Sequence, residues 1–348
     1  MATITNSAQG KSISVAESGN AYHRNLQMNL QAGTGVSFKY GVQSGQGGFN
    51  LSQSSSVTGN IFSAGSVMGG GNTINGNIVS AGPNGLVSGI NATGTVSAHT
   101  IQNSTVGGDA HYSSSTTLIS TTVTGTKYPD STDIATTSLP ISDLQISNWE
   151  QDAQAGGTAT CSNGTYKLFN TTTTIGPIQI PCDLDIKNST VTITGPIWVQ
   201  GNITLEVNPV INMDSSLGGS NVAIIADNPT ASSTSGKITI SSGATFNGSG
   251  TTGSFVFMVS QNDSAEKGGS NKAIDMSQSS SNLVGYAAHG LITISNGGNN
   301  NNSQVKAATA YQINLFNSSK ITYDTTLPNT VFQSGATGGY TQTEWNEI

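Results

Sequence analysis

Charged side chains are scarce in this chain. Asp, Glu, Lys and Arg make up 8% of its 348 residues, against about 25% in an ordinary soluble domain. The formal net charge is −7, and Arg24 is the single arginine. A surface that follows nucleic-acid phosphates needs a basic stripe. The composition therefore argues against nucleic-acid binding.

Long apolar runs are missing as well. None approaches the roughly 20 residues that a membrane-spanning helix needs, and no signal peptide opens the sequence. The composition is nevertheless typical of an exported protein. We therefore expect an extracellular or cell-surface location, with membrane contact only through an N-terminal export or anchor segment that this sequence lacks.

Cysteine occurs only at Cys161 and Cys182, 21 positions apart. They lack CxxC spacing, and no histidine lies close enough in sequence to indicate a zinc site. We predict a disulfide, which would stabilise a loop of this size by about 3 kcal/mol in the chain-entropy model and implies an oxidising location. The alternative is a pair of buried thiols, which the polar neighbours Thr160, Ser162 and Asp183 disfavour.

Ser, Thr, Asn and 43 glycines take the place of the missing charges. Polar low-complexity tracts often stay disordered, but short apolar triplets recur throughout this chain, which disorder does not predict. Uncharged polar residues suit a stack of parallel coils, because rungs about 4.8 Å apart would place like charges over one another. Asn, Ser and Thr can instead form ladders.

The strongest pattern is an internal repeat. Residues 57–65 (VTGNIFSAG) are echoed 17 positions later by residues 74–82 (INGNIVSAG). The marker glycines of this and weaker echoes are 17, 18, 14 and 17 residues apart: Gly59, Gly76, Gly94, Gly108 and Gly125. These are coil lengths of a solenoid with short strands, and we expect the glycines to supply corners with positive φ. The sequence therefore predicts an all-β fold, a parallel β-helix.

A single helix is expected to interrupt the strands, over residues 142–155. Ser142 and Gln145 are spaced as a capping box, and Ile146, Trp149 and Ala153 continue an apolar stripe at helical spacing. We predict that Ile146 and Trp149 anchor this helix against an end or a side of the solenoid. The alternative is that Trp149 is a platform for a ligand.

Changes in the sequence pattern divide the chain into four parts. They are an N-terminal β segment (1–48), a first β-helical region (49–138), a linker helix (139–156) and a second β-helical region (157–348) that closes with an aromatic cap over a solenoid end. In the last part, the apolar runs 222–226 and 255–259 suit strands that are covered on both faces.

Several segments together resemble one family. They are residues 35–43 (GVSFKYGVQ), 57–65, 139–143 (LPISD), 194–199 (TGPIWV), 201–204 (GNIT) and 345–348 (WNEI). Over residues 20–348 the chain is similar to type IV pilin-like (PilX-like) surface β-helix proteins of ultrasmall candidate-phylum bacteria. The resemblance implies export, surface display and a β-helix, and it brings no known catalytic residues. The pilin-like helix of that family is not in this sequence.

Parallel β-helices often cleave polysaccharides, with acidic calcium ligands and a basic proton acceptor in lyases or with close carboxylates in hydrolases. The 18 acidic residues here are scattered. The densest group is Asp183, Asp185 and Lys187, which alternation places on one strand face. Asp183 and Asp185 are therefore the candidate ligand or metal residues, against the plainer interpretation of a solvated strip. We predict no catalytic residue, no cofactor and no metal.

Two weaker hypotheses concern a metal site at histidines and a sugar-binding surface at aromatic side chains. His99 and His111 are 12 residues apart and would approach on neighbouring coils, although a joint metal site there is disfavoured. Uncharged surfaces with exposed aromatic side chains can hold glycans. The aromatic residues that would stack on sugars if exposed are Tyr112, Tyr128, Trp198, Tyr286, Tyr311 and Tyr323.

We therefore predict an extracellular structural or adhesive surface protein, a filament or pilus-associated subunit without catalysis. Its expected partners are further copies of itself or a cell-surface glycan or protein. The first alternative is a carbohydrate-active β-helix enzyme, a polysaccharide lyase or hydrolase. The second alternative is a glycan-binding module.

Overall fold

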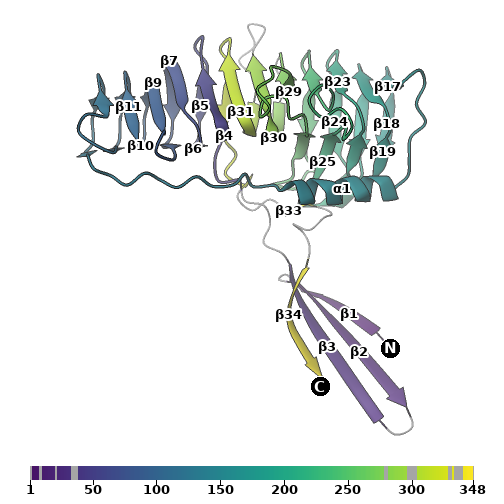
Figure 1. The fold of residues 1–348 in the computed structure, drawn as a ribbon. Helices are drawn as coiled ribbons and strands as arrows, with labels where there is room; N and C mark the ends of the chain where they lie inside the picture. The colour runs from purple at the N-terminus through teal and green to yellow at the C-terminus, as the bar shows by residue number, and fades with distance from the viewer. Residues whose placement is uncertain are drawn as a thin grey trace.

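The computed structural model describes residues 2–7, 10–19, 22–32, 38–277, 281–295, 304–327, 331–332 and 340–347. Thirty strands join into one sheet that winds as a solenoid, and four strands form a separate antiparallel sheet (Figure 1). The solenoid strands pair in parallel with those of neighbouring coils. The predicted all-β parallel β-helix is therefore confirmed.

Each coil contributes up to three strands, which stack into three parallel sides. Side 1 contains β17 (Thr165–Phe169), β20 (Asp183–Lys187), β23 (Ile203–Glu206), β26 (Ile238–Ile240), β29 (Lys272–Met276), the later parts of β30 (Ser281–Ser295), β31 (Gln304–Phe316) and β4 (Val42–Leu51), the first parts of β7 (Val67–Asn75) and β9 (Leu86–Ala92), β11 (Thr100–Gln102) and β14 (Leu118–Ile119).

Side 2 contains β18 (Thr172–Ile175), β21 (Thr190–Ile193), β24 (Val210–Met213), β27 (Thr245–Asn247), β32 (Lys320–Thr322), β5 (Ser56–Thr58), the later parts of β7 and β9, β12 (Thr105–Val106) and β15 (Thr122–Val123). Side 3 contains β19 (Ile178–Ile180), β22 (Ile197–Val199), β25 (Ser220–Ala226), β28 (Val256–Ser260), the first parts of β30, β31 and β4, β6 (Ile61–Ser63), β8 (Ile78–Ser80), β10 (Val96–Ala98), β13 (Ala110–His111) and β16 (Lys127–Tyr128).

The order of the coils in space differs from their order in the sequence. The coils from β4 to β16 wind from the middle of the solenoid to one end, and residues 129–142, here called the strap, then run back along it (Figure 1). After helix α1 (Asp143–Ala155), the coils from β17 to β32 wind from the opposite end back to the middle. There β31 pairs with β4, and β32 pairs with β5. Two parts of the chain that are distant in sequence thus form one continuous solenoid.

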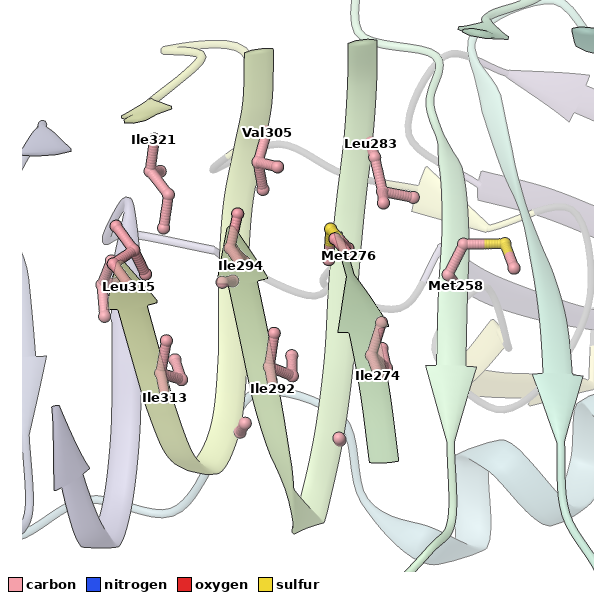
Figure 2. Close-up of a cluster of buried hydrophobic side chains, with 14 of the residues drawn as sticks. Met258, Ile274, Met276, Leu283, Ile292, Ile294, Val305, Ile313, Leu315 and Ile321 are labelled. Carbon is pink, nitrogen blue, oxygen red and sulfur yellow. The ribbon is translucent and has the colours of Figure 1, made fainter. Parts of the chain in front are cut away.

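The core consists of columns of inward-pointing side chains that continue through this central junction. Alternation along a strand turns every second residue inward, and in-register pairing places it over the matching residue of the next coil. Figure 2 shows two such columns beside the junction, which are Ile274, Ile292 and Ile313, and Met276, Ile294 and Leu315. The register carries them on to the buried side chains of Phe49 and Leu51 in β4.

The marker glycines form the corner between sides 2 and 3, and their spacing matches the coil lengths. Of the five, only Gly59 has a positive φ, so the expectation of left-handed corners is wrong for the other four. Close stacking explains these glycines instead. A Cβ on Gly76 would lie 2.3 Å from the carbonyl oxygen of Gly59, and one on Gly125 would lie 2.5 Å from that of Gly108. A side chain would therefore push neighbouring coils apart.

Asparagine supplies left-handed corners between sides 1 and 2. Residues at this corner with φ near +50° include Asn103, Asn170, Asn188, Asn208 and Asn317. Asparagine tolerates this conformation better than most residues. The Asn188 side-chain amide also donates to Oδ1 of Asn170 on the adjacent coil at 2.8 Å. Stacked asparagines therefore tie the coils together without charge repulsion.

Side 3 has cover on its outer face as well. In β25 and β28 nearly every residue is buried, as predicted for strands covered on both faces. The outer cluster there includes Phe257 and Tyr286 of the sheet, Ile146 and Trp149 of α1, and Phe332 of β33 (Val331–Phe332). Helix α1 therefore closes a second, smaller hydrophobic core outside the solenoid.

The separate sheet has the strand order β1 (Ala2–Ser7), β2 (Gly10–Gly19), β3 (Tyr22–Ala32) and β34 (Tyr340–Glu347). Strand β34, in the segment expected to cap a solenoid end, pairs antiparallel with β3 instead. The described part of the solenoid begins at Phe38, just before β4 of the central junction, and extends to Phe332 of β33, which pairs with β25 nearer to the β17 end. The two ends of the chain thus pair with each other in a sheet of their own.

Candidate functional site

Helix α1 packs against β19, β22 and β25 of side 3. Its N-terminus has the predicted capping box, in which the Ser142 backbone N–H donates to Oε1 of Gln145 at 2.7 Å and the Gln145 N–H donates to the Ser142 hydroxyl at 3.3 Å. Ile146 and Trp149 are 0% and 1% exposed. The Trp149 ring lies 4.4 Å from that of Phe332. This burial leaves Trp149 no free face on which a ligand could stack.

Two carboxyl groups meet under the helix. Glu150 lies one turn after Ile146 and is only 9% exposed, and its carboxyl group faces that of Asp227, which follows β25. Burial, followed by repulsion from Asp227 and a hydrogen bond with it, raises the pKa of Glu150 to about 8. Burial also raises the pKa of Asp227. Because two adjacent carboxylates rarely both ionise, this carboxyl pair retains a proton at neutral pH.

His289 ties the first turn of α1 to the solenoid. Its Nε2 lies 3.1 Å from Oδ1 of Asp143 and its Nδ1 lies 2.5 Å from Oε2 of Glu266. Burial lowers the pKa of His289, but the hydrogen bonds and charges of the two carboxylates outweigh burial and raise it overall. The imidazole of His289 therefore bridges the helix and the loop that carries Glu266.

These ionisable groups connect elements of the fold. The carboxyl pair resembles the paired acids of a glycosidase in composition. Glu150, however, lies on the buried face of α1, so a polysaccharide cannot reach both carboxyl groups. A second tie lies close by, where the buried Tyr286 hydroxyl donates to the carbonyl oxygen of Ile141 at the end of the strap. The geometry supports attachment of the strap and helix to side 3.

The candidate residues Asp183 and Asp185 lie on β20, where burial alternates as the sequence predicts, with Leu184 and Ile186 turned inward. Oδ1 of Asp183 accepts the backbone N–H of Asn202 on the next coil at 2.7 Å. Burial, and then the charge of Asp183, raises the pKa of Asp185. Asp183 thus has a structural partner, and the ligand role of the two residues remains a prediction.

Cys161 and Cys182 are bonded in a disulfide, as predicted from their spacing. The bond lies at the β17 end of the solenoid. There the Ala159 N–H donates to the carbonyl oxygen of Gln179 in β19 at 2.8 Å, and Thr158 bridges Gln179 in parallel. The disulfide therefore fastens the segment that follows α1 over the open edge of side 3.

The rings that were considered as sites have different surroundings. His99 pairs with Asp133 of the strap at 3.0 Å, whereas His111 stacks on Tyr128 with the ring centroids 4.5 Å apart. Among the candidate sugar platforms, Tyr112 and Tyr286 are buried, and Trp198, Tyr311 and Tyr323 are half-buried. Tyr128 alone among these six is well exposed, at 42%.

Sequence reasoning missed Glu150, Asp227, Asp143, Glu266 and His289 as a connected group. The available signal was local: Glu150 follows Ile146 at i+4, which places a carboxylate beside the apolar stripe of the helix. The partners Asp227 and His289 lie far away in sequence. In the described part of the chain, no three His, Cys, Asp or Glu side chains are arranged to hold a metal ion.

No helix within the described residues is both long and apolar enough to cross a membrane.

Comparisons with known proteins give little further information. No protein-family model matches the chain, and no curated protein matches it. Among solved structures, the chain is similar to the crystal structure of the competence-associated pilin ComZ from Thermus thermophilus. That similarity covers 99% of this chain and 83% of the ComZ chain, at 10% sequence identity and a TM-score of 0.32. A likeness this weak supports no argument about function.

Proposed function

We propose that this chain is a non-catalytic structural or adhesive protein of a bacterial surface, pilus-associated as the sequence resemblance implies. The observation that carries the proposal is the long parallel solenoid, whose coils extend to both sides of the central junction between β31 and β4. The strands outside the solenoid, β1 to β3 and β34, pair with one another. The solenoid thus presents two arms, one on each side of the junction, and such extended repeat surfaces suit display and contact.

The chemistry of the solenoid supports the same function. A disulfide fits an oxidising, extracellular location, and asparagine ladders with few charges give a polar surface that does not repel further copies. The acidic and imidazole groups that come together at α1 hold the fold. A surface scaffold needs this rigidity and needs no acid–base pair open to solvent.

The test of this proposal is a search for catalysis by the intact chain. We expect no new reducing ends or unsaturated products after incubation with acidic and neutral polysaccharides, with and without calcium. Cleavage that is lost in Asp185→Asn, or in Glu150→Gln, would overturn the proposal in favour of a polysaccharide lyase or hydrolase. Immunogold labelling of intact producing cells should place the chain outside the cell, and purely cytoplasmic labelling would contradict display.

A further inference from the structure

A cavity of about 420 Å³ lies between the strap and the outer face of side 3, near the β16 end. Ser97, Ala98 and His111 form its floor, and strap residues 131–134 form its wall. This volume falls within the range of about 300–1,000 Å³ that is typical of small-ligand pockets. Apart from Ala98, its lining residues belong neither to the solenoid core nor to the outer core under α1.

The cavity exists because one outward column of side 3 contains a small residue, Ser97, between larger ones under the strap. In-register pairing aligns Phe62, Val79, Ser97 and His111 in this column. Phe62 is 3% exposed and fills its position, whereas Ser97 is too small to do so. The space over Ser97 therefore stays open.

Three contacts hold the strap in place over this opening. The Ser131 N–H donates to the carbonyl oxygen of Tyr112 at 3.0 Å, and the Gly82 N–H donates to that of Ile134 at 2.8 Å. Between them, Oδ2 of Asp133 lies 3.0 Å from Nδ1 of His99. The wall is thus fixed at both ends and in its middle, so the pocket is preorganised.

The groups around the pocket combine hydrogen-bonding side chains with aromatic rings. Ser97, Ser131 and Thr132 offer hydroxyls, and Asp133 offers a carboxylate that can accept from ligand hydroxyls. His111 is the aromatic ring of the lining, and it stacks on Tyr128 of the next coil, outside the lining, with the two rings inclined by only 4°. A flat ring beside hydroxyl and carboxylate groups suits a sugar, whose C–H face is apolar and whose edge is polar.

The charge of the site favours an uncharged sugar. Asp133 is the only carboxylate in the lining, and it would repel an anionic sugar. The larger hollow of about 480 Å³ between residues 53–56 and 70–73 also has hydroxyl and amide groups, but its lining contains no aromatic ring. The aromatic stack distinguishes the strap pocket.

We propose that the strap pocket binds a neutral glycosyl unit of a surface polysaccharide, with Asp133 and the hydroxyls on the sugar edge and the ring of His111, backed by Tyr128, beside its face. The inference rests on the proposed function, because the sugar is held and not cleaved. It gives the adhesive surface a partner of defined chemistry and places the contact on the arm that ends at β16.

The test is calorimetric titration of the intact chain with maltotetraose, cellotetraose and chitotetraose, and with tetragalacturonate as the anionic counterpart. We expect saturable binding of at least one neutral tetrasaccharide at one site. His111→Ala should weaken it about two- to tenfold, since an aromatic contact contributes about 0.5–1.5 kcal/mol beyond its buried area. Ser97→Phe, which fills the cavity with the residue that this column already accepts at Phe62, should abolish binding.

Phe169→Ala is the matched control, because Phe169 is 43% exposed at the opposite end of the solenoid. It should leave the affinity unchanged. Binding of none of the neutral sugars, a preference for tetragalacturonate, or equal weakening by Phe169→Ala would each overturn the proposal. Mass spectrometry of the titrated sugars separates the two hypotheses: cleaved products would contradict the non-catalytic function, whereas absent binding would contradict only the pocket.

Discussion

One outward column of side 3 is covered in two ways. Under α1 and the end of the strap, Ile225, Val259 and Tyr286 are fully buried. Beyond the central junction, the same column runs under the rest of the strap and ends at the exposed Tyr128. The parallel register continues throughout, so the backbone geometry is shared. The difference shows that the segment packed over side 3, and not the coil itself, determines whether an outward residue is buried or exposed.

Burial follows the same division. Strand length is not set by the helix, since β19 and β22, on which α1 packs, have three residues each. In β25 and β28, which α1 and its neighbours cover, nearly every residue is buried. At the opposite end, the outward residues of β13 and β16 are half-buried and exposed. The arm under α1 should therefore be the more stable of the two.

The largest expected effect is at the helix. Trp149→Ala should lower the free energy of unfolding by about 3–5 kcal/mol, because it opens a cavity among fully buried aromatic side chains. Ile134→Ala on the strap is the control, since Ile134 is 41% exposed and surface changes stay within about 0.5 kcal/mol. Urea unfolding of both variants measures the contrast. Equal effects would show that helix and strap contribute alike.

The carboxyl pair should make the stability of the helix-covered region fall between about pH 4.5 and pH 8. The pKa of Glu150 rises from 4.5 to about 8 on folding, so the folded state holds a proton that the unfolded state loses in this window. Stability is therefore full below pH 4.5 and falls as the pH rises towards 8. Glu150→Gln removes this proton dependence and should stabilise the protein at pH 9 by up to about 4 kcal/mol.

Thermal unfolding of the parent and Glu150→Gln at pH 5, 7 and 9 measures this effect. The gap between the two should widen as the pH rises. Asp152→Asn on the same helix is the control and should give no widening. A constant gap across the three pH values would contradict a shared proton between Glu150 and Asp227.

Local patterns allowed much of this architecture to be predicted. The capping box at Ser142 and the apolar stripe through Ile146 and Trp149 depend on spacings of three or four residues, which a sequence displays directly. The double-sided burial of β25 and β28 followed from uninterrupted apolar runs. The 17-residue echo between Gly59 and Gly76 gave the coil length, since adjacent coils in this part are consecutive in sequence.

Long-range pairings could not be predicted in the same way. Every coil offers similar apolar triplets, so nothing in Ile313 identifies Phe49 as its neighbour across the central junction. The contact between Glu150 and Asp227, and that between His289 and Asp143, join separate elements for the same reason. The strap pocket depends on the absence of a large side chain at Ser97, which has meaning only when Phe62 is known to lie in the same column.

A smaller effect is expected at the corner between sides 2 and 3. Gly76→Ala should destabilise the protein by about 1–3 kcal/mol, as overpacking does, because the new Cβ would lie 2.3 Å from the carbonyl oxygen of Gly59. Gly70→Ala is a matched control in the same strand region, since nothing lies within 4 Å of its Cβ position. Chemical unfolding should separate them. Similar losses of stability in the two variants would indicate that backbone conformational preference, and not close stacking of the coils, selects glycine at this corner.

The smallest effect on stability, and the most informative about assembly, concerns the ends of the two arms. The inward column that contains Ile61, Ile78, Val96 and Ala110 ends at Lys127, which is exposed. The inward columns of the other two sides at this end finish at the apolar Leu118 and Val123. Polar or charged residues that point inward are a known protection of sheet edges against further pairing. Lys127 is therefore the charged residue that disfavours coil-on-coil stacking between molecules at the β16 end.

Lys127→Val should remove this protection while it changes the stability of the monomer by no more than about 0.5 kcal/mol. The central junction between β31 and β4 already joins coils that are distant in sequence, so an apolar end offers a second molecule the same kind of contact. Sedimentation velocity at increasing concentration should show larger species for Lys127→Val and none for Lys187→Val, a lysine that points outward from β20. If both variants remain monomeric, Lys127 is not what prevents stacking, and the disulfide-fastened segment at the other end must provide the barrier.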